Sequence, residues 1–321
     1  MGTILFRFYY LFFAIPLAII LCYCSSDPDS SLIALNNYQE ERENQQRAVD
    51  NSFDGSSSEQ TSTSGLESYL LPDIDLSNWK VTLPIGNPTS IRPPEILEYA
   101  SNEILRPFFY NDSIDGSLVF HTYPDASTLN SNYSRTELRE QIEPGSDNIN
   151  WTFEQGGRLK GTLSVPEVSL DSNGEPYRVI VMQIHGRLTD IQRDLIGEDD
   201  NNAPPILKIY WQNGRVRVKT KVVKNLSDSE TELLLSSAWG DDEGHTFSES
   251  VGNQKFSLEV VADKGMLKVV LNSNDSIIYD DINIEKWSIF ENYFKAGNYL
   301  QTTNPNAFST VKYYNLEVSH D

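Results

Sequence analysis

The sequence predicts an all-β protein built as an antiparallel β-sandwich, of a jelly-roll type with strands paired over long sequence distances. Three observations support this fold. From residue 71 onwards, short runs of alternating apolar and polar residues are separated by turn residues, and helical periodicity is scarce. Asn213-Gly214 separates two of these runs, which is a strong hairpin signal. The chain of 321 residues also leaves room for one β domain of about 200–250 residues.

Ordered structure is expected to begin at Leu71 and Pro72, so residues 71–321 are expected to form one domain. A single short helix is expected at residues 93–99, and no internal repeat is evident. Alternation predicts strands at residues 117–123, 134–142, 157–165, 177–187, 206–211, 215–224, 255–262, 267–271, 293–301 and 308–318.

The net charge of −21 limits the classes of partner. A field of this sign repels nucleic acid and anionic lipid, so we expect neither as a partner. An anionic substrate would need a local basic cleft to draw it in against the global field. We expect a monomer.

Residues 1–24 have the pattern of an export signal. Arg7 precedes an apolar run, 8–21, that is too short for a comfortable membrane span. Cys24 follows this run ahead of Ser and Asp, which resembles a bacterial lipoprotein processing site, although Tyr23 is bulkier than the usual small residue. We expect acylation at Cys24 and a place on the bacterial outer membrane or cell surface. Plain secretion and an uncleaved anchor are the alternatives.

Residues 25–70 are rich in Ser, Asn, Gln, Glu and Asp, the composition of a disordered linker. Both cysteines of the chain, Cys22 and Cys24, precede this linker. The folded domain therefore has no disulfide and no thiolate chemistry, and its hydrophobic core alone must stabilise it.

The stretch 293–301 reads YFKAGNYLQ and is the centre of the functional argument. In a strand, Tyr293, Lys295, Tyr299 and Gln301 share one face, and the opposite face is mostly apolar. One face would pack on the core while the other presents a cation, two phenols and an amide. A half-buried strand with a polar outer side is the simpler interpretation of this stretch alone.

A second stretch, SRTELR at 134–139, places Arg135, Glu137 and Arg139 on one face. A carboxylate between two guanidinium groups can orient both for bidentate binding of a carboxylate. The alternative is a surface ladder of ion pairs, each worth well under about 1 kcal/mol.

A third stretch, VIVMQIHG at 179–186, is nearly continuous in apolar residues except for Gln183 and His185. These two share a face, and we expect Ile180, Met182 and Ile184 on the opposite one. A polar pair in so apolar a strand suggests a site, although a lone histidine is more often structural. No second histidine or nearby aspartate completes a metal-binding spacing, so no metal is predicted.

The run RVRVKTK at 215–221 places Arg215, Arg217, Lys219 and Lys221 on one face. Such a basic strip in an acidic protein suits an anionic polymer. The alternative is an edge strand whose lysines block pairing with other chains. Tyr210 and Trp211 on the partner strand could stack on sugar rings, although Trp211 could equally belong to the core.

Two further features are weaker. The stretch 188–205 is expected to be a long loop that could act as a lid over the site, because long loops in compact domains tend to be functional. Acidic runs at 198–200 and 241–243 lack the regular ligand spacing of a calcium site, so solvated loops are the preferred interpretation.

Taken together, RTELR at 135–139, QIH at 183–185, YFKAGNYLQ at 293–301 and WKVTLP at 79–84 closely resemble the alginate lyases of polysaccharide lyase family 7. The resemblance covers roughly residues 71–321 and implies a β-jelly-roll whose concave sheet forms the substrate cleft. It departs from the family at Leu300, where members often have Asn. This position lies on the apolar face of its strand, away from the chemistry.

The resemblance implies β-elimination on alginate with no metal or organic cofactor. It matches Arg135, Gln183, His185 and Tyr299 to the catalytic positions. It also matches cleft-lining or supporting positions to Glu137, Arg139, Lys295 and Gln301. Charge from Lys295 and Arg135 is expected to favour the phenolate of Tyr299. In this family, Ile in the middle of the Gln-x-His motif tends to accompany activity on guluronate-containing blocks, so Ile184 leads us to expect that preference.

Three other functions stay open at this point. A non-catalytic carbohydrate-binding module would use the basic strip but has no need of a Tyr–His pair. A glycoside hydrolase needs two facing carboxylates, whereas only Glu137 lies on a candidate strand. A lyase acting on another polyuronate would share every residue named above.

Overall fold

A computed structural model describes residues 71–72, 74–127 and 131–320. The expected export signal 1–24 with Cys24 and the expected linker 25–70 lie outside these described residues. Within the described part of the chain, no helix is long and apolar enough to cross a membrane.

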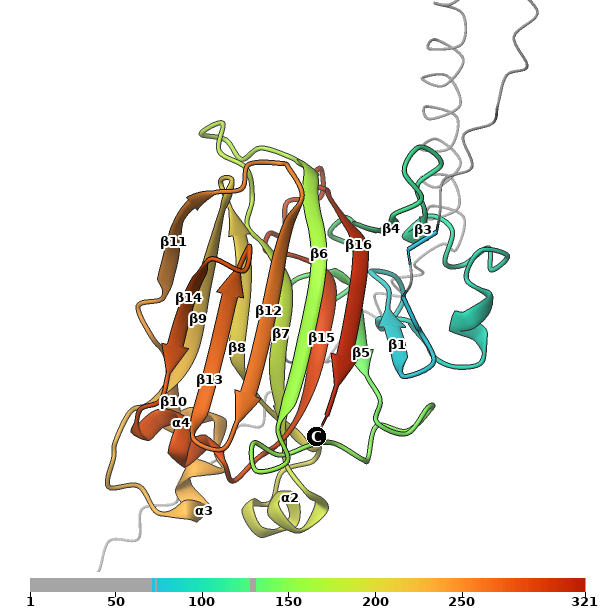
Figure 1. The fold of residues 1–321 in the computed structure, drawn as a ribbon. Helices are drawn as coiled ribbons and strands as arrows, with labels where there is room; N and C mark the ends of the chain where they lie inside the picture. Colours follow the sequence, from blue (N-terminus) through green and yellow to red (C-terminus); the bar gives the residue numbers. More distant parts are fainter. Residues whose placement is uncertain (1–70, 73, 128–130, 321) are drawn as a thin grey trace, which may run out of the picture. The chain divides into compact units, whose positions relative to one another are not determined.

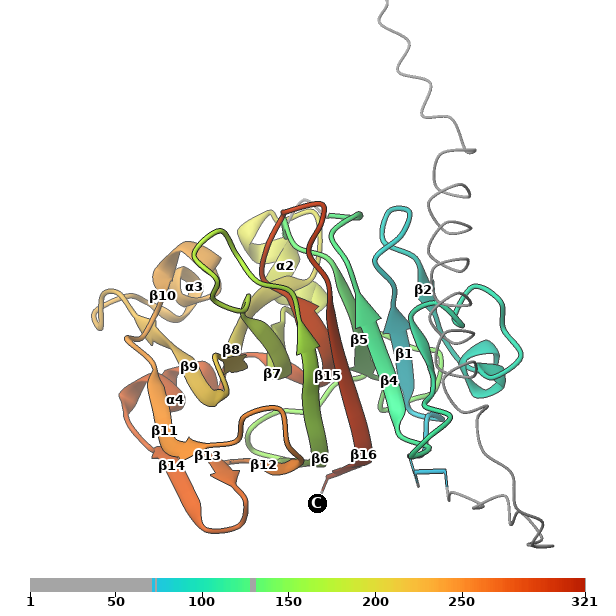
Figure 2. The same cartoon turned by 90° about the horizontal axis from the view of Figure 1, so that it is seen from above.

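The described residues fold into two antiparallel sheets packed face to face; Figure 1 shows them with the strands upright, and Figure 2 shows them from above. The larger sheet has nine strands in the order β10 (Trp239–Asp241), β9 (Arg215–Val223), β8 (Asn202–Gln212), β7 (Val179–Arg187), β15 (Glu291–Leu300), β5 (Arg135–Glu140), β1 (Trp79–Thr82) and β2 (Ser90–Ile91), with β11 (His245–Ser250) also paired to β9. The seven-stranded sheet runs in the order β14 (Asp275–Tyr279), β13 (Met266–Leu271), β12 (Phe256–Asp263), β6 (Gly157–Val168), β16 (Ser309–Ser319), β4 (Leu118–Thr122) and β3 (Phe109–Asn111).

Each strand expected from alternation has a counterpart among these elements, so the all-β sandwich of the jelly-roll type is confirmed. The neighbours in each sheet come from distant parts of the sequence: β15 lies between β5 and β7, and β6 lies between β12 and β16. The three motif strands are therefore adjacent in the larger sheet. The expected short helix is present as a 3-10 turn, η1 (Glu95–Glu98), and a second such turn is η2 (Ser236–Ala238).

In the part of the chain that the structure describes, three α-helices were not expected: α2 (Asp190–Ile196), α3 (Glu230–Leu233) and α4 (Ile282–Trp287). Figure 1 shows all three at the same end of the two layers. Thr189 with Gln192 and Ser229 with Glu232 form capping boxes that start α2 and α3. A capping box satisfies two backbone N–H groups that would otherwise lack a partner, so even a helix of one or two turns has a defined start. The expected loop at 188–205 is thus largely α2 and the beginning of β8.

The core lies between the sheets and follows the predicted alternation. On β15, Phe294, Ala296 and Leu300 are fully buried in it. Asn298 shares that face because its amide donates to the carbonyl groups of Phe120 and Ser309, at 2.9 and 2.8 Å, and a satisfied amide can be buried at little cost. The core-facing side of β15 therefore fixes which residues the strand presents on its other side.

Gly297 allows β5 and β15 to approach closely at the centre of the larger sheet. Its φ is +143°, and an added Cβ would lie 2.6 Å from the Thr136 carbonyl oxygen and 2.9 Å from Glu137 Cα. Only glycine adopts this backbone conformation without strain. The glycine of the 293–301 stretch is thus required by the packing of the two strands.

Candidate active site

A cavity of about 760 Å³ lies on the face of the larger sheet that is turned away from the core. Its floor comes from β5, β15, β7 and β8, and its rim from the segments before β5 and at the start of β8. The lining residues are Ser131, Asn132, Tyr133, Arg135, Ile180, Gln183, His185, Asn202, Ala203, Pro204, Pro205, Lys208, Tyr210, Ser236, Tyr293, Lys295, Tyr299 and Gln301.

The four residues predicted as catalytic all line this one cavity. Arg135 is paired across the strands with Tyr299, and Gln183 with Lys295, so β5, β15 and β7 place them side by side. His185 lies two pairs further along β7, on the same face as Gln183 and opposite Tyr293. Strands about 4.8 Å apart bring groups from sequence positions 135 to 299 to one site.

Glu137 lies beneath the cavity and holds its floor together. It is 1% exposed, forms an ion pair with Lys295, and lies 3.6 Å from an Arg135 guanidinium nitrogen. It also accepts a hydrogen bond of 2.5 Å from Gln183 Nε2. An ionised carboxylate accepts several such bonds, so Glu137 fixes three cavity side chains at once.

Arg139 does not pair with Glu137, as an Arg-Glu-Arg row predicted, and it does not line the cavity. Its guanidinium is used by the segment that follows β5: it donates to the Asp147 carbonyl at 3.1 Å and to Asn150 Oδ1 at 2.8 Å. It also lies over the Tyr293 ring, 4.1 Å from the centroid. Arg139 therefore supports the site from behind Tyr293.

His185 is held as a neutral base. Its Nδ1 lies 3.0 Å from the Gly186 carbonyl oxygen, which can only accept, so Nδ1 carries the proton and Nε2 has the lone pair. Burial, followed by the charge of Lys295, lowers the pKa of His185 to about 3. The imidazole also stacks on Tyr293, with centroids 5.2 Å apart and planes at 12°, which fixes its orientation.

Tyr299 is held as a phenol. Burial raises the pKa of Tyr299, and the charge of Arg135 and a hydrogen bond with Ser131 oppose this only in part. The charge of Arg135 does favour the phenolate, as expected, but loss of solvation outweighs it and the net shift of the pKa is upwards. The Arg135 guanidinium lies 4.4 Å above the ring centroid, and the hydroxyl contacts Ser131 Oγ.

Lys295 supplies the cavity with a titratable cation. Burial lowers the pKa of Lys295 to about 8, although the negative charge of Glu137 raises it and so opposes the effect. At neutral pH this side chain is still charged. A cation 7% exposed in an acidic protein is the local basic element that an anionic substrate requires.

One residue of β7 lies on the face opposite to the one expected. Ile180 lines the cavity with Gln183 and His185, whereas Met182 and Ile184 belong to the core as expected. The pairing of β7 with β8 and with β15 shifts register beside Met182. A β-bulge of this kind interrupts strict alternation, so side chains on its two sides follow different parities.

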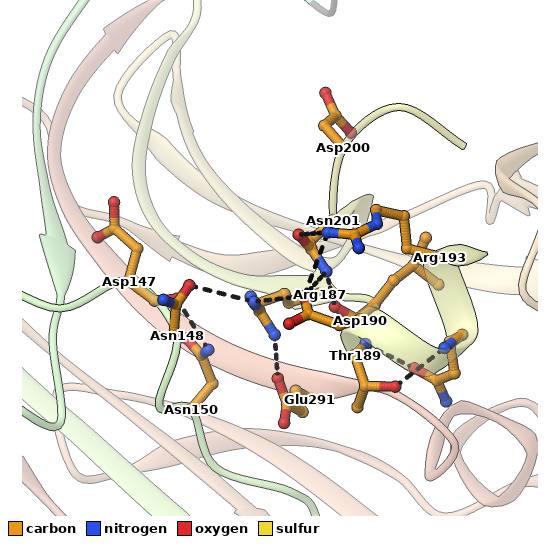
Figure 3. A network of polar contacts seen from close by, with 12 residues as sticks. Asp147, Asn148, Asn150, Arg187, Thr189, Asp190, Arg193, Asp200, Asn201 and Glu291 are labelled. Carbon is orange, nitrogen blue, oxygen red and sulfur yellow. Dashed lines mark hydrogen bonds and ion pairs between the residues drawn. The ribbon is translucent and has the colours of Figure 1, made fainter. Parts of the chain in front are cut away.

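The rim at the start of β8 is fixed by a polar network around Arg187 (Figure 3). Arg187 donates to Glu291 at 2.6 Å and to Asn148 Oδ1 at 3.4 Å. Asn201 donates to Asp190 and to the Leu188 carbonyl, both at 2.9 Å, which closes the chain around α2. Residues 202–205, which line the cavity, thus follow directly from an anchored segment.

The basic strip of β9 does not line the cavity. Arg215 and Arg217 donate to backbone carbonyl groups of Ser248 and Glu243, and Lys219 donates to that of Asp242. Lys221 pairs with Asp241 at 2.6 Å. Because β10 and β11 both pair with β9, it is not an edge strand either. A role for these four cations in substrate binding stays a prediction.

Sequence reasoning missed several lining residues. Lys208 lies on β8 opposite Gln183 and is held by Asp241 at 3.0 Å. Ser131 and Tyr133 precede β5 in a segment without periodicity, so no sequence signal pointed to them. Tyr210 does line the cavity, whereas Trp211 is in the core and donates to the Gly252 carbonyl at 2.8 Å.

Among residues 71–320, apart from the undescribed positions 73 and 128–130, no group of three or more His, Cys, Asp or Glu side chains is placed to hold a metal ion. Asp241 and Asp242, in one of the two acidic runs, bond instead to Lys221 and to Thr220.

Comparison with known proteins gives a consistent result. The family model described as alginate lyase matches residues 74–320. Alginate lyase A1-II', a member of polysaccharide lyase family 7, is 29% identical with a TM-score of 0.60, over 77% of this chain and 96% of that one. A doubly substituted variant of that enzyme in complex with substrate (GGMG) is 28% identical with a TM-score of 0.62, over 78% and 95%. Alginate lyase AlgAT5 from family 7 is 25% identical with a TM-score of 0.56, over 78% and 99%. No curated protein sequence matches the chain.

Proposed function

This chain belongs to the alginate lyases of polysaccharide lyase family 7, and on that premise we propose how its residues divide the reaction. The enzyme is a polysaccharide lyase that acts on alginate. In β-elimination, the proton on C5 of a uronate leaves, the C5–H electron pair becomes a C4=C5 double bond, and the C4–O4 bond breaks. The proposal assigns each of these events to a named side chain.

His185 is the proposed base that takes the C5 proton on Nε2, and Tyr299 is the proposed acid that protonates O4. The observation that carries this assignment is that one cavity holds a neutral imidazole with its lone pair on Nε2 and a phenol that keeps its proton. A base must be unprotonated and an acid protonated at the working pH, and both conditions are met near neutrality.

Arg135 and Gln183 are the proposed partners of the substrate carboxylate. The C5 proton is only weakly acidic while that carboxylate keeps its full charge, so donors directed at it stabilise the enediolate that develops. Gln183 uses one N–H on Glu137 and has a second to offer. Lys295 and Gln301 line the same cavity, and Lys295 adds positive charge beside these donors.

Guluronate-containing blocks are the proposed preference. In guluronate the C5 hydrogen lies on the face opposite to the departing O4, so acid and base must be different groups. The pair of His185 and Tyr299 meets this requirement. Burial raises the pKa of Tyr299, which makes a second role for it as the C5 base, as mannuronate would need, less favourable.

The test measures ultraviolet absorbance of the unsaturated product with the full chain on pure guluronate and pure mannuronate blocks. Tyr299→Phe should abolish turnover on both with an unchanged circular dichroism spectrum. Tyr314→Phe removes a hydroxyl from the other sheet, 3.2 Å from Asp115, and serves as the matched control. Near-normal turnover by Tyr299→Phe would refute its role, and faster cleavage of mannuronate blocks would refute the preference.

Export and acylation at Cys24 are part of the proposal for the intact protein and rest on the sequence of residues 1–24 alone. Mass spectrometry of the mature N-terminus distinguishes an acylated cysteine from a plain cleavage product or an uncleaved chain. The proposed monomer is tested by sedimentation of the mature protein.

A further inference from the structure

The hydroxyl of Ser131 contacts the hydroxyl of Tyr299 at the rim of the cavity. Ser131 lies just before β5, four residues ahead of Arg135, and it lines the cavity. Its Oγ also lies 3.2 Å from the carbonyl oxygen of Tyr133 and 3.2 Å from the backbone nitrogen of the same residue. One serine hydroxyl thus connects the backbone of the rim with the phenol.

The direction of each hydrogen bond follows from the chemistry of the groups. A carbonyl oxygen only accepts, so the single Ser131 proton is donated to the Tyr133 carbonyl. The lone pairs of Oγ then accept from the Tyr133 N–H and from the Tyr299 hydroxyl. Ser131 is therefore fully satisfied while Tyr299 is protonated.

We propose that Ser131 is a positioning residue for proton transfer at Tyr299, accepting from the phenol in the free enzyme and donating to the phenolate once the phenol proton has moved to O4. The inference rests on the proposed role of Tyr299 as the acid. As the C4–O4 bond breaks, the proton on the Tyr299 oxygen moves to O4 and the C5 proton moves to His185 Nε2. Ser131 keeps its own proton and turns it, by rotation about Cβ–Oγ, from the Tyr133 carbonyl to the phenolate oxygen.

The other groups near Tyr299 are not placed to exchange a hydrogen bond with its hydroxyl. Among the described residues, Ser131 is the one side chain that hydrogen-bonds the Tyr299 hydroxyl. The Arg135 guanidinium lies over the ring face, 4.4 Å from its centroid, and so approaches the π-system instead of the oxygen. A phenolate formed at this half-buried position without a hydrogen-bond donor would be poorly stabilised.

The experiment compares Ser131→Ala, Ser131→Thr and Ser134→Ala. Ser134 is the matched control because its hydroxyl ties the same segment, donating to the Ala126 carbonyl at 2.7 Å and accepting from Asp125 N–H at 2.9 Å, with no contact to Tyr299. Loss of a charge-assisted hydrogen bond should lower kcat of Ser131→Ala roughly ten- to a hundredfold with little change in KM. Ser131→Thr, which keeps a hydroxyl, should restore most of it.

The pH profile separates positioning from mere folding. The hydrogen bond with Ser131 lowers the pKa of Tyr299. Without this bond, the alkaline limb of the pH profile of kcat should move to higher pH in Ser131→Ala. Ser134→Ala should lower the melting temperature without moving that limb.

Each outcome has one meaning. If Tyr299→Phe is inactive while Ser131→Ala keeps the wild-type kcat and pH profile, the inference about Ser131 fails and the proposed function stands. It also fails if Ser131→Ala merely matches Ser134→Ala in stability and rate and Ser131→Thr restores nothing. If Tyr299→Phe turns over normally, the proposed function itself fails.

Discussion

Glu137→Gln tests the charge network beneath the cavity. The substitution keeps an oxygen that can accept from Gln183 Nε2 but removes the negative charge opposite Lys295. Removing one partner of a buried ion pair commonly destabilises a protein by about 3–5 kcal/mol, because the remaining charge is uncompensated. Lys295 can escape that penalty by losing its proton, so the loss of stability should depend on pH.

The size of the effect follows from the pKa of Lys295. In the wild type it is about 8, and Glu137 is the group that raises it, so in Glu137→Gln it falls further. Below pH 8, Lys295 keeps its proton in the folded wild type but has lost it in the folded Glu137→Gln variant. In the unfolded chains of both proteins, Lys295 keeps its proton. The free-energy difference then grows by about 1.4 kcal/mol for each pH unit below 8. Above pH 8, both folded lysines are neutral and the difference becomes small and constant.

Urea denaturation of both proteins at pH 6.5, 7, 8 and 9 measures this difference, with these pH values chosen around the pKa of about 8. We expect a loss of about 1–2 kcal/mol at pH 7 that shrinks towards pH 9. Glu137→Gln with Lys295→Met should remove the pH dependence, since the titrating group is gone. A difference that is the same at every pH, or that grows towards pH 9, would refute the reasoning.

Two further predictions concern β15. Gly297→Ala should destabilise the fold by about 3 kcal/mol or more, as measured by urea denaturation. The added Cβ would lie 2.6 and 2.9 Å from backbone atoms of β5, and the φ of +143° suits glycine. A loss below about 0.5 kcal/mol would contradict the packing account. KM of the wild type for alginate should rise as pH increases through about 8, where Lys295 loses its charge. In Lys295→Arg, KM should stay constant over that range because the guanidinium keeps its charge. An equal rise of KM in the wild type and in Lys295→Arg would assign the effect to another group.

Much of the fold and the catalytic floor could be predicted because strands β5, β7 and β15 carry the chemistry in regular alternation. Arg135, Gln183, Lys295 and Tyr299 were placed on the correct faces from period-two patterns alone. Ile180 was not, because a bulge depends on how two neighbouring strands pair and leaves no mark in one strand's own sequence.

Two further features of the site depend on partners that local sequence patterns cannot reveal. The cations of β9 do share one face, but β10, β11 and the turn at Asp241–Glu243 supply acceptors for them. Tyr299 does lie beside Arg135, but the extent of its burial decides the direction of its pKa. Both facts depend on the packing of several elements, which only the folded chain contains.

The site combines two levels of constraint. On β15, Phe294, Ala296 and Leu300 must face the core, so a slip of one residue would bury Lys295 and Tyr299 and expose the apolar side chains. The positions of Lys295 and Tyr299 therefore depend on the same hydrophobic burial that stabilises the sandwich. The part of the rim that precedes β5, residues 131–133, is held by side-chain hydrogen bonds such as that of Ser131, so it can change without disturbing that register. We expect the rim to decide the length of the products, which is why the strand motifs disclose the reaction more readily than its product length.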